Sequence, residues 1–116
     1  MEHACFADRL ARAMDRAGSP ACVGLDPVFE RLPEAVRAAH QDPTQAIEAF
    51  CTGVIDAVAG EVGVVKPQSA CFERYGSAGV RALEQTVAHA KNAGLVVILD
   101  AKRGDIGISA AHYAAA

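Results

Sequence analysis

The sequence contains no tryptophan, few other aromatic residues and no surplus of basic charge. Aromatic residues make up only 5% of the 116 residues, so the core must be built mainly from alanine, valine, isoleucine and leucine. Lysine and arginine number 11 against 14 aspartates and glutamates, which leaves no surplus to neutralise nucleic-acid phosphates or anionic lipids. We therefore expect no nucleic acid and no membrane as partners. Because 52% of the residues are apolar, we expect a folded chain.

Long apolar runs and paired cysteines are also absent. No stretch approaches the roughly 20 apolar residues of a membrane-spanning helix. The first residues include Glu2, Asp8 and Arg9 in place of the basic start and apolar stretch of a secretory signal, so we expect a cytoplasmic protein. The cysteines show no CxxC spacing and lie in apolar segments, which predicts buried free thiols and no metal site. They are Cys5, Cys22, Cys51 and Cys71.

Short apolar runs alternate with segments of helical periodicity along the chain. The predicted strands are residues 21–25, 62–65 and 95–99. The predicted helices are residues 3–17, 34–40, 43–60 and 80–90, and a segment from about 107. The start of the third helix is predicted by a capping pattern: Asp42 as the capping acid, Pro43 in the first turn and Gln45 three residues after the cap. Strands separated by helices predict a parallel sheet with right-handed crossovers. The residues that follow the three strands are about 40 and about 34 residues apart, close to the repeat of a (β/α)₈ barrel of about 250 residues.

The fold class predicted is therefore α/β, a TIM barrel of which this chain covers about the first three βα units and an N-terminal helix. We expect residues 1–116 to be the N-terminal part of a single barrel domain that is incomplete at its C-terminus. Each predicted strand is followed by a charged residue, Asp26, Lys66 or Asp100. In parallel α/β folds the carboxyl edge of the sheet is where active sites are built. The pattern predicts a site at this edge.

The segment from Asp100 to Asp105 carries the densest charge near this edge. If strand geometry persists, the period of two places Asp100 and Lys102 on the same face, beside Lys66 from the neighbouring strand. Alternating acids and lysines keep one another ionised in a half-buried site. A purely structural network of ion pairs is the alternative for any single pair. Three strands that all end in charge favour an active site.

Three segments of the chain carry a family resemblance: residues 22–27, 64–73 and 98–107. With these motifs in order and at compatible spacing, the sequence resembles the orotidine 5'-monophosphate decarboxylase family, in particular its bacterial branch with longer chains. The resemblance implies decarboxylation of orotidine 5'-monophosphate to uridine 5'-monophosphate in de novo pyrimidine biosynthesis, without cofactor or metal. It also implies a homodimer.

The resemblance implies a catalytic array of Lys66, Asp100, Lys102 and Asp105. Lys102 would donate the proton to carbon 6 of the pyrimidine as carbon dioxide leaves. Asp100 would lie against the substrate carboxylate, and Lys66 would contact Asp100 and a ribose hydroxyl.

The other implied residues bind substrate or complete a second site. Asp26 would bind the ribose, and Ser109 occupies a position where the family often has a threonine near the ribose. Asp105 and Ile106 would enter the site of the partner subunit.

Two other hypotheses are compatible with the sequence. The first is a related sugar-phosphate aldolase or lyase of the same barrel superfamily, which shares an Asp-x-Lys-x-x-Asp strand end and depends on Mg²⁺. The second is an inactive fragment that acts only as an assembly module through an open sheet edge. The match at residues 66–68 and Arg103-Gly104 favours the decarboxylase. We expect the chain alone to be inactive, because it lacks the family's phosphate-binding loop.

Overall fold

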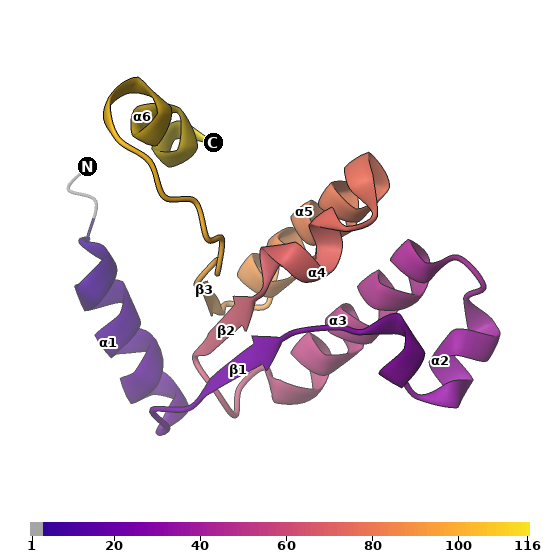
Figure 1. The fold of residues 1–116 in the computed structure, drawn as a ribbon. Helices are drawn as coiled ribbons and strands as arrows, with labels where there is room; N and C mark the ends of the chain where they lie inside the picture. The colour runs from indigo at the N-terminus through magenta and orange to yellow at the C-terminus, as the bar shows by residue number, and fades with distance from the viewer. Residues whose placement is uncertain (1–3) are drawn as a thin grey trace.

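The computed structural model describes residues 4–116, in which helices and strands alternate along the chain (Figure 1). The elements are α1 (Phe6–Ala17), β1 (Cys22–Leu25), η1 (Phe29–Arg31), α2 (Glu34–Ala39), α3 (Pro43–Val58), β2 (Val64–Pro67), α4 (Ser69–Glu73), α5 (Gly76–Asn92), β3 (Val96–Val97) and α6 (Gly107–Ala115). The predicted helix 3–17 corresponds to α1, although residue 3 lies outside the described residues.

The strands form a parallel sheet in the order β1-β2-β3, as the sequence predicts. Regular strand structure in β3 covers Val96–Val97, fewer residues than the predicted 95–99. Pairing nevertheless continues beyond β3, since the amide of Ile98 donates to the carbonyl of Val65 at 3.0 Å. The amide of Asp100 donates to the carbonyl of Pro67, also at 3.0 Å. The backbone of β3 is therefore held beside β2 up to Asp100.

Helices α3 and α5 pack against each other, and their apolar residues form one core with the sheet. Leu25 of β1 and Val65 of β2 belong to this core and are almost fully buried. Because side chains alternate along a strand, Gly24 and Lys66 lie on the opposite face. This alternation gives the sheet one apolar face covered by helices and an opposite face on which Val64 is buried and Lys66 lies toward the carboxyl edge.

The beginning of α3 follows the predicted capping pattern. One carboxylate oxygen of Asp42, Oδ1, accepts hydrogen bonds from the amides of Thr44 at 2.8 Å and Gln45 at 3.3 Å, and Pro43 is the first helical residue. The hydrogen bond from the Thr44 hydroxyl, together with these two backbone hydrogen bonds, lowers the pKa of Asp42. The cap stabilises the helix that crosses from β1 to β2.

Helix α1 approaches the sheet at Gly63, directly before β2. A Cβ atom at Gly63 would lie 2.4 Å from the carbonyl oxygen of Ala13, so only glycine permits this contact. Ala13 is the buried residue of α1. The close contact fixes α1 near the amino end of β2, away from the edge where the charged residues lie.

Residues 69–73 form the short helix α4, which is not among the helices predicted from the sequence. Five residues are too few for helical periodicity to appear. Tertiary packing stabilises α4 instead: Phe72 is fully buried in the core, and Gly79 of α5 lies directly against its backbone carbonyl.

The prediction of buried cysteines is only partly correct. All four thiols are free, but Cys5 and Cys22 are exposed. Cys5 precedes α1, and Cys22 lies on the face of β1 opposite the core, so an apolar neighbourhood in sequence did not bury either side chain. Cys51 is fully buried in α3, which raises the pKa of its thiol to about 12. Partial burial also raises the pKa of Cys71.

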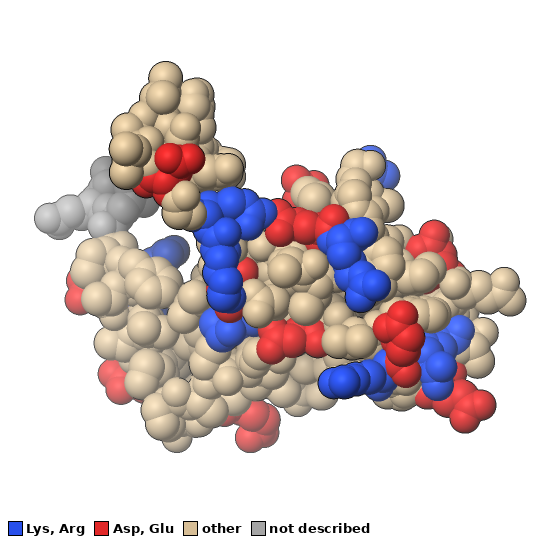
Figure 2. Space-filling view, viewed as in Figure 1, with Lys and Arg blue, Asp and Glu red and all other residues tan. Residues whose placement is uncertain are grey.

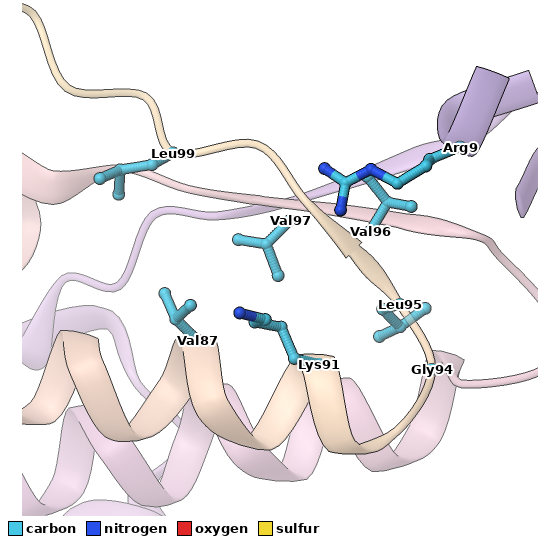
Figure 3. Close-up of a pocket in the computed structure, with 8 residues that line it drawn as sticks. All are labelled: Arg9, Val87, Lys91, Gly94, Leu95, Val96, Val97 and Leu99. Atoms are coloured by element: carbon cyan, nitrogen blue, oxygen red, sulfur yellow. The ribbon is translucent and has the colours of Figure 1, made fainter. Parts of the chain in front are cut away.

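A cavity of about 420 Å³ opens beside β3 (Figure 3). Val87 of α5 and Val97 of β3 face each other in it, and Arg9 of α1 and Lys91 of α5 supply its charges. None of the predicted catalytic residues lines this cavity.

Beyond the loop that follows β3, α6 exposes Ile108 and Tyr113. Over residues 4–116 the helices are too short or too polar to cross a membrane.

Candidate active site

The parallel sheet brings the predicted charged residues to one edge. Gly24 of β1 is paired with Lys66 of β2, and Gln68 forms an isolated bridge with Asp100. The ladder continues around this bridge, since the amide of Gln68 donates to the carbonyl of Leu25 at 3.0 Å. The carboxyl ends of all three strands therefore meet at the same edge, as the sequence predicted.

Asp100 lies between two lysines at this edge. Lys66 Nζ is 3.4 Å from one carboxylate oxygen of Asp100, Oδ2, and Lys102 Nζ is 2.7 Å from the other, Oδ1. The prediction that Asp100 and Lys102 face the same side is confirmed, although residues 101–106 form no regular strand. The hydrogen bond from Lys102 lowers the pKa of Asp100. Partial desolvation raises this pKa, and the hydrogen bond from Lys66 lowers it by a smaller amount than that from Lys102. The side chain of Asp100 is 24% exposed and that of Lys102 is 74% exposed.

The structure does not bring the other predicted residues into this cluster. The Asp105 carboxylate accepts a hydrogen bond from the amide of Ile106 at 2.8 Å, within its own loop. Ile106 is 85% exposed, and Ser109 is half-buried in α6. Asp26 is exposed at the end of β1, and its carboxylate turns back over Gly24.

Gln68 is a member of the cluster that the sequence did not assign. Its amide oxygen accepts a hydrogen bond from Lys102 Nζ at 3.1 Å. The Nζ atom of Lys102 therefore has two acceptors: Gln68, which follows β2, and Asp100, which lies after β3. The signal was present in the sequence: Gln68 follows Lys66 by two residues, the same period that places Asp100 and Lys102 together.

A second pair that the sequence did not assign joins α4 to the loop after β3. The guanidinium of Arg103 forms an ion pair with the carboxylate of Glu73. Arg103 belongs to one of the family motifs, but no spacing rule connects it with Glu73, 30 residues earlier. Tertiary structure alone creates this contact.

The cluster is a set of compensating charges around one half-buried carboxylate. An ammonium group that faces solvent and is held by two acceptors can bind an anionic substrate and donate a proton to it. On the face shown in Figure 2, acidic side chains accompany the basic ones, and no broad area carries basic charge alone. Within residues 4–116, no three His, Cys, Asp or Glu side chains gather where they would hold a metal ion.

Because the pKa of Asp100 is lowered, its contribution to the stability of the fold is expected to depend on pH. A carboxyl whose pKa is lowered in the folded state stabilises the fold above its ordinary pKa of about 3.9. That contribution is lost as the pH falls through the folded-state pKa. In the Lys102→Met variant the pKa of Asp100 is expected to rise, because its main hydrogen-bond donor is gone.

Carboxyl carbon NMR titration measures this change, with Asp42 as internal control. The pKa of Asp42 is lowered by groups at the start of α3, so it is expected to be the same in both proteins. An unchanged Asp100 pKa in Lys102→Met would contradict the arrangement described here.

Parallel strands joined by helices, with charged side chains at their carboxyl edge, define this chain as an α/β protein, and its similarity to solved decarboxylase structures identifies the sheet as part of a TIM barrel. Comparison with known families agrees: residues 19–116 match the family described as "Orotidine 5'-phosphate decarboxylase / HUMPS family". The chain belongs to this family, and the resemblance inferred from its three motifs is confirmed.

Known relatives place the chain at the N-terminal part of longer proteins. It is 50% identical over 109 residues to the orotidine 5'-phosphate decarboxylase of Streptomyces coelicolor and 47% identical over 114 residues to that of Rhodopirellula baltica. Both alignments cover 94% of this chain and 38% of the relative. The structure of Leishmania donovani OMP decarboxylase matches 96% of this chain and 38% of its own, with a TM-score of 0.75 and 34% identity. The chain thus spans less than two fifths of the length of these relatives.

Proposed function

We propose that this chain supplies the charged catalytic array of an enzyme that decarboxylates orotidine 5'-monophosphate to uridine 5'-monophosphate in pyrimidine biosynthesis. The observation that carries the proposal is Asp100 held between Lys66 and Lys102 at the carboxyl edge of the sheet. Family membership supports it, because the motifs that contain these residues lie within the matched region. Metal-dependent cleavage of a sugar phosphate has no comparable support, since the relatives described above are named decarboxylases.

The chemistry explains why an ammonium group is needed. Loss of carbon dioxide from an sp² ring carbon leaves an electron pair in the ring plane with no neighbouring electron sink. A fixed ammonium beside that carbon both stabilises the charge and supplies the proton, so the reaction needs no cofactor. Lys102 fits this role, because it reaches solvent while Asp100 and Gln68 hold its Nζ atom.

Repulsion between Asp100 and the substrate carboxylate is a smaller contribution. Two unit charges about 4 Å apart interact by about 4 kcal/mol at an effective dielectric constant of 20, which corresponds to roughly three decades of rate. Enzymes usually accelerate reactions by at least about 10⁶-fold. Most of the acceleration is therefore assigned to stabilisation of the transition state, with Lys102 central.

The remaining residues have secondary roles in this proposal. Lys66 and Asp26 bind the ribose from the ends of neighbouring strands, and Ser109 lies near it at the start of α6. Asp105 and Ile106 reach into the site of a second subunit in a homodimer. The 85% exposure of Ile106 supports this role, because an isoleucine so exposed at the edge of a site suits a protein contact.

In this proposal residues 1–116 form the N-terminal part of a single barrel domain in a cytoplasmic enzyme. Further strands would pair with the open edge of β3 and complete the pocket for the phosphate and the pyrimidine. The cavity beside β3 has the apolar lining that such an addition would cover.

A chimera tests the proposed activity. Residues 1–116 replace the matched N-terminal part of the Streptomyces coelicolor relative, and loss of orotidine 5'-monophosphate is followed by ultraviolet absorbance. We expect turnover within about tenfold of the parent enzyme, unchanged by EDTA, and none from the 116-residue chain alone. A folded chimera without turnover, or one that cleaves a ketose phosphate only with Mg²⁺, would overturn the proposal.

A further inference from the structure

Residues 101–106 carry Lys102 but form no regular secondary structure, so other contacts must fix their backbone. Ser69, the first residue of α4, supplies the first of these contacts: its amide donates to the carbonyl of Asp100 at 3.1 Å. The hydroxyl of Ser69 donates to Oε2 of Glu73 at 3.2 Å. Ser69 is only 3% exposed, so the packing around it restricts its movement.

Arg103 connects Glu73 to the backbone of Lys102. One guanidinium nitrogen, Nη2, pairs with Oε1 of Glu73. The other, Nη1, donates to the main-chain carbonyl of Lys102 at 3.0 Å. Glu73 thus accepts from Ser69 with one oxygen and from Arg103 with the other, and both of its oxygens are used. The result is a continuous chain of hydrogen bonds from α4 to the backbone of Lys102.

We propose that Glu73 is a positioning residue for Lys102: through Arg103 it fixes the Lys102 backbone, while Asp100 and Gln68 fix the ammonium group. This inference rests on the proposed function, in which Lys102 must stand at one carbon of the substrate. It concerns Glu73 and Arg103, which do not touch the ammonium group themselves.

The exposure of Lys102 is the physical reason that such positioning is needed. Its side chain is 74% exposed, so packing does not restrict its four-carbon stem. Its Nζ atom therefore stays in place only if both ends of the side chain are held. A displacement of about 1 Å is enough to lower turnover by about 10²-fold. The Glu73–Arg103 pair itself is about one third exposed, so its loss is expected to leave the fold intact.

Glu73→Gln in the chimera tests the proposal. The amide keeps an acceptor for Ser69 but loses the charge that holds Arg103. We expect kcat to fall about 10- to 100-fold while KM changes by less than about twofold. The control is Glu84→Gln, the same change at an exposed position of α5, which is expected to leave both constants unchanged.

Two further measurements separate positioning from a general structural effect. In Glu73→Gln the backbone N–H groups of residues 101–106 are expected to become more mobile, seen as lower ¹⁵N order parameters, while those of α3 stay rigid. Arg103→Lys is expected to resemble Glu73→Gln, because an ammonium cannot bridge Glu73 and the Lys102 carbonyl as a guanidinium does. The double variant is expected to be no worse than either single one, since both break the same connection.

Unchanged kcat and unchanged order parameters in Glu73→Gln would overturn the proposal, as would independent, multiplying effects of the two substitutions. An inactive chimera would count against the proposed function instead. In that case the order parameters of residues 101–106 still decide whether Glu73 holds this loop.

Discussion

Replacing Lys102 by alanine in the chimera is expected to lower turnover by at least about 10³-fold. The ammonium group serves two purposes in the proposed reaction. Electrostatic stabilisation of developing charge contributes about 10²- to 10³-fold, and proton donation about 10²- to 10⁴-fold. Because one group supplies both, its removal is expected to cost more than either alone. Spectrophotometric assay of orotidine 5'-monophosphate loss measures the effect.

Two further lysine and arginine variants make this result specific. Arg81→Ala removes an exposed basic side chain of α5 and is expected to leave turnover unchanged. Lys102→Arg keeps the positive charge but offers an acid that does not release its proton in proteins, so it is expected to remain well below the unaltered chimera. Near-normal turnover of a folded Lys102→Ala protein would show that another residue donates the proton.

Replacing Gly79 by alanine is expected to destabilise the fold by about 2 kcal/mol or more. Within a helix this change would ordinarily be favourable by about 1 kcal/mol. At Gly79, however, a Cβ atom would lie 1.8 Å from the carbonyl oxygen of Phe72, and a backbone carbonyl cannot move aside. Helices α4 and α5 would have to separate, which would expose Phe72. The clash therefore outweighs the gain in helix propensity.

Gly53→Ala is the matched control, because Gly53 lies inside α3 with nothing within 4 Å of the Cβ position. It is expected to raise stability by about 0.5–1 kcal/mol through helix propensity alone. Urea unfolding midpoints of the two variants and the unaltered chain measure the difference. A Gly79→Ala protein as stable as Gly53→Ala would mean that α4 and α5 do not approach as closely as the structure shows.

Most elements of the fold were predictable because they rest on local signals. Asp42, Pro43 and Gln45 predicted the start of α3 through hydrogen bonds within one helical turn, and those bonds are present. The parallel order of the strands followed from the lengths of the helical segments between them. Helix α4 was missed because its five residues are too few to show helical periodicity, and the burial of Phe72 that stabilises it is a tertiary contact.

The charged cluster was predictable to the extent that it follows strand periodicity. Asp100 and Lys102 lie two residues apart, and Lys66 lies near the carboxyl end of the neighbouring strand, so their convergence follows from the parallel sheet. By the same rule Gln68 belongs with them. The exposure of Cys22 was misjudged, because its neighbours in sequence are apolar while its own side of the strand is not covered by helices.

The sequence by itself therefore determined the class of fold, the edge of the sheet where the charged cluster lies and three of its members, Lys66, Asp100 and Lys102. These properties depend on periodicity, capping and strand direction, which act over a few residues or one crossover. Only the tertiary structure decided that Gln68 accepts from Lys102 and that Glu73 holds Arg103 beside it. Such contacts join residues about 30 positions apart, and their geometry exists only once the helices have packed on the sheet.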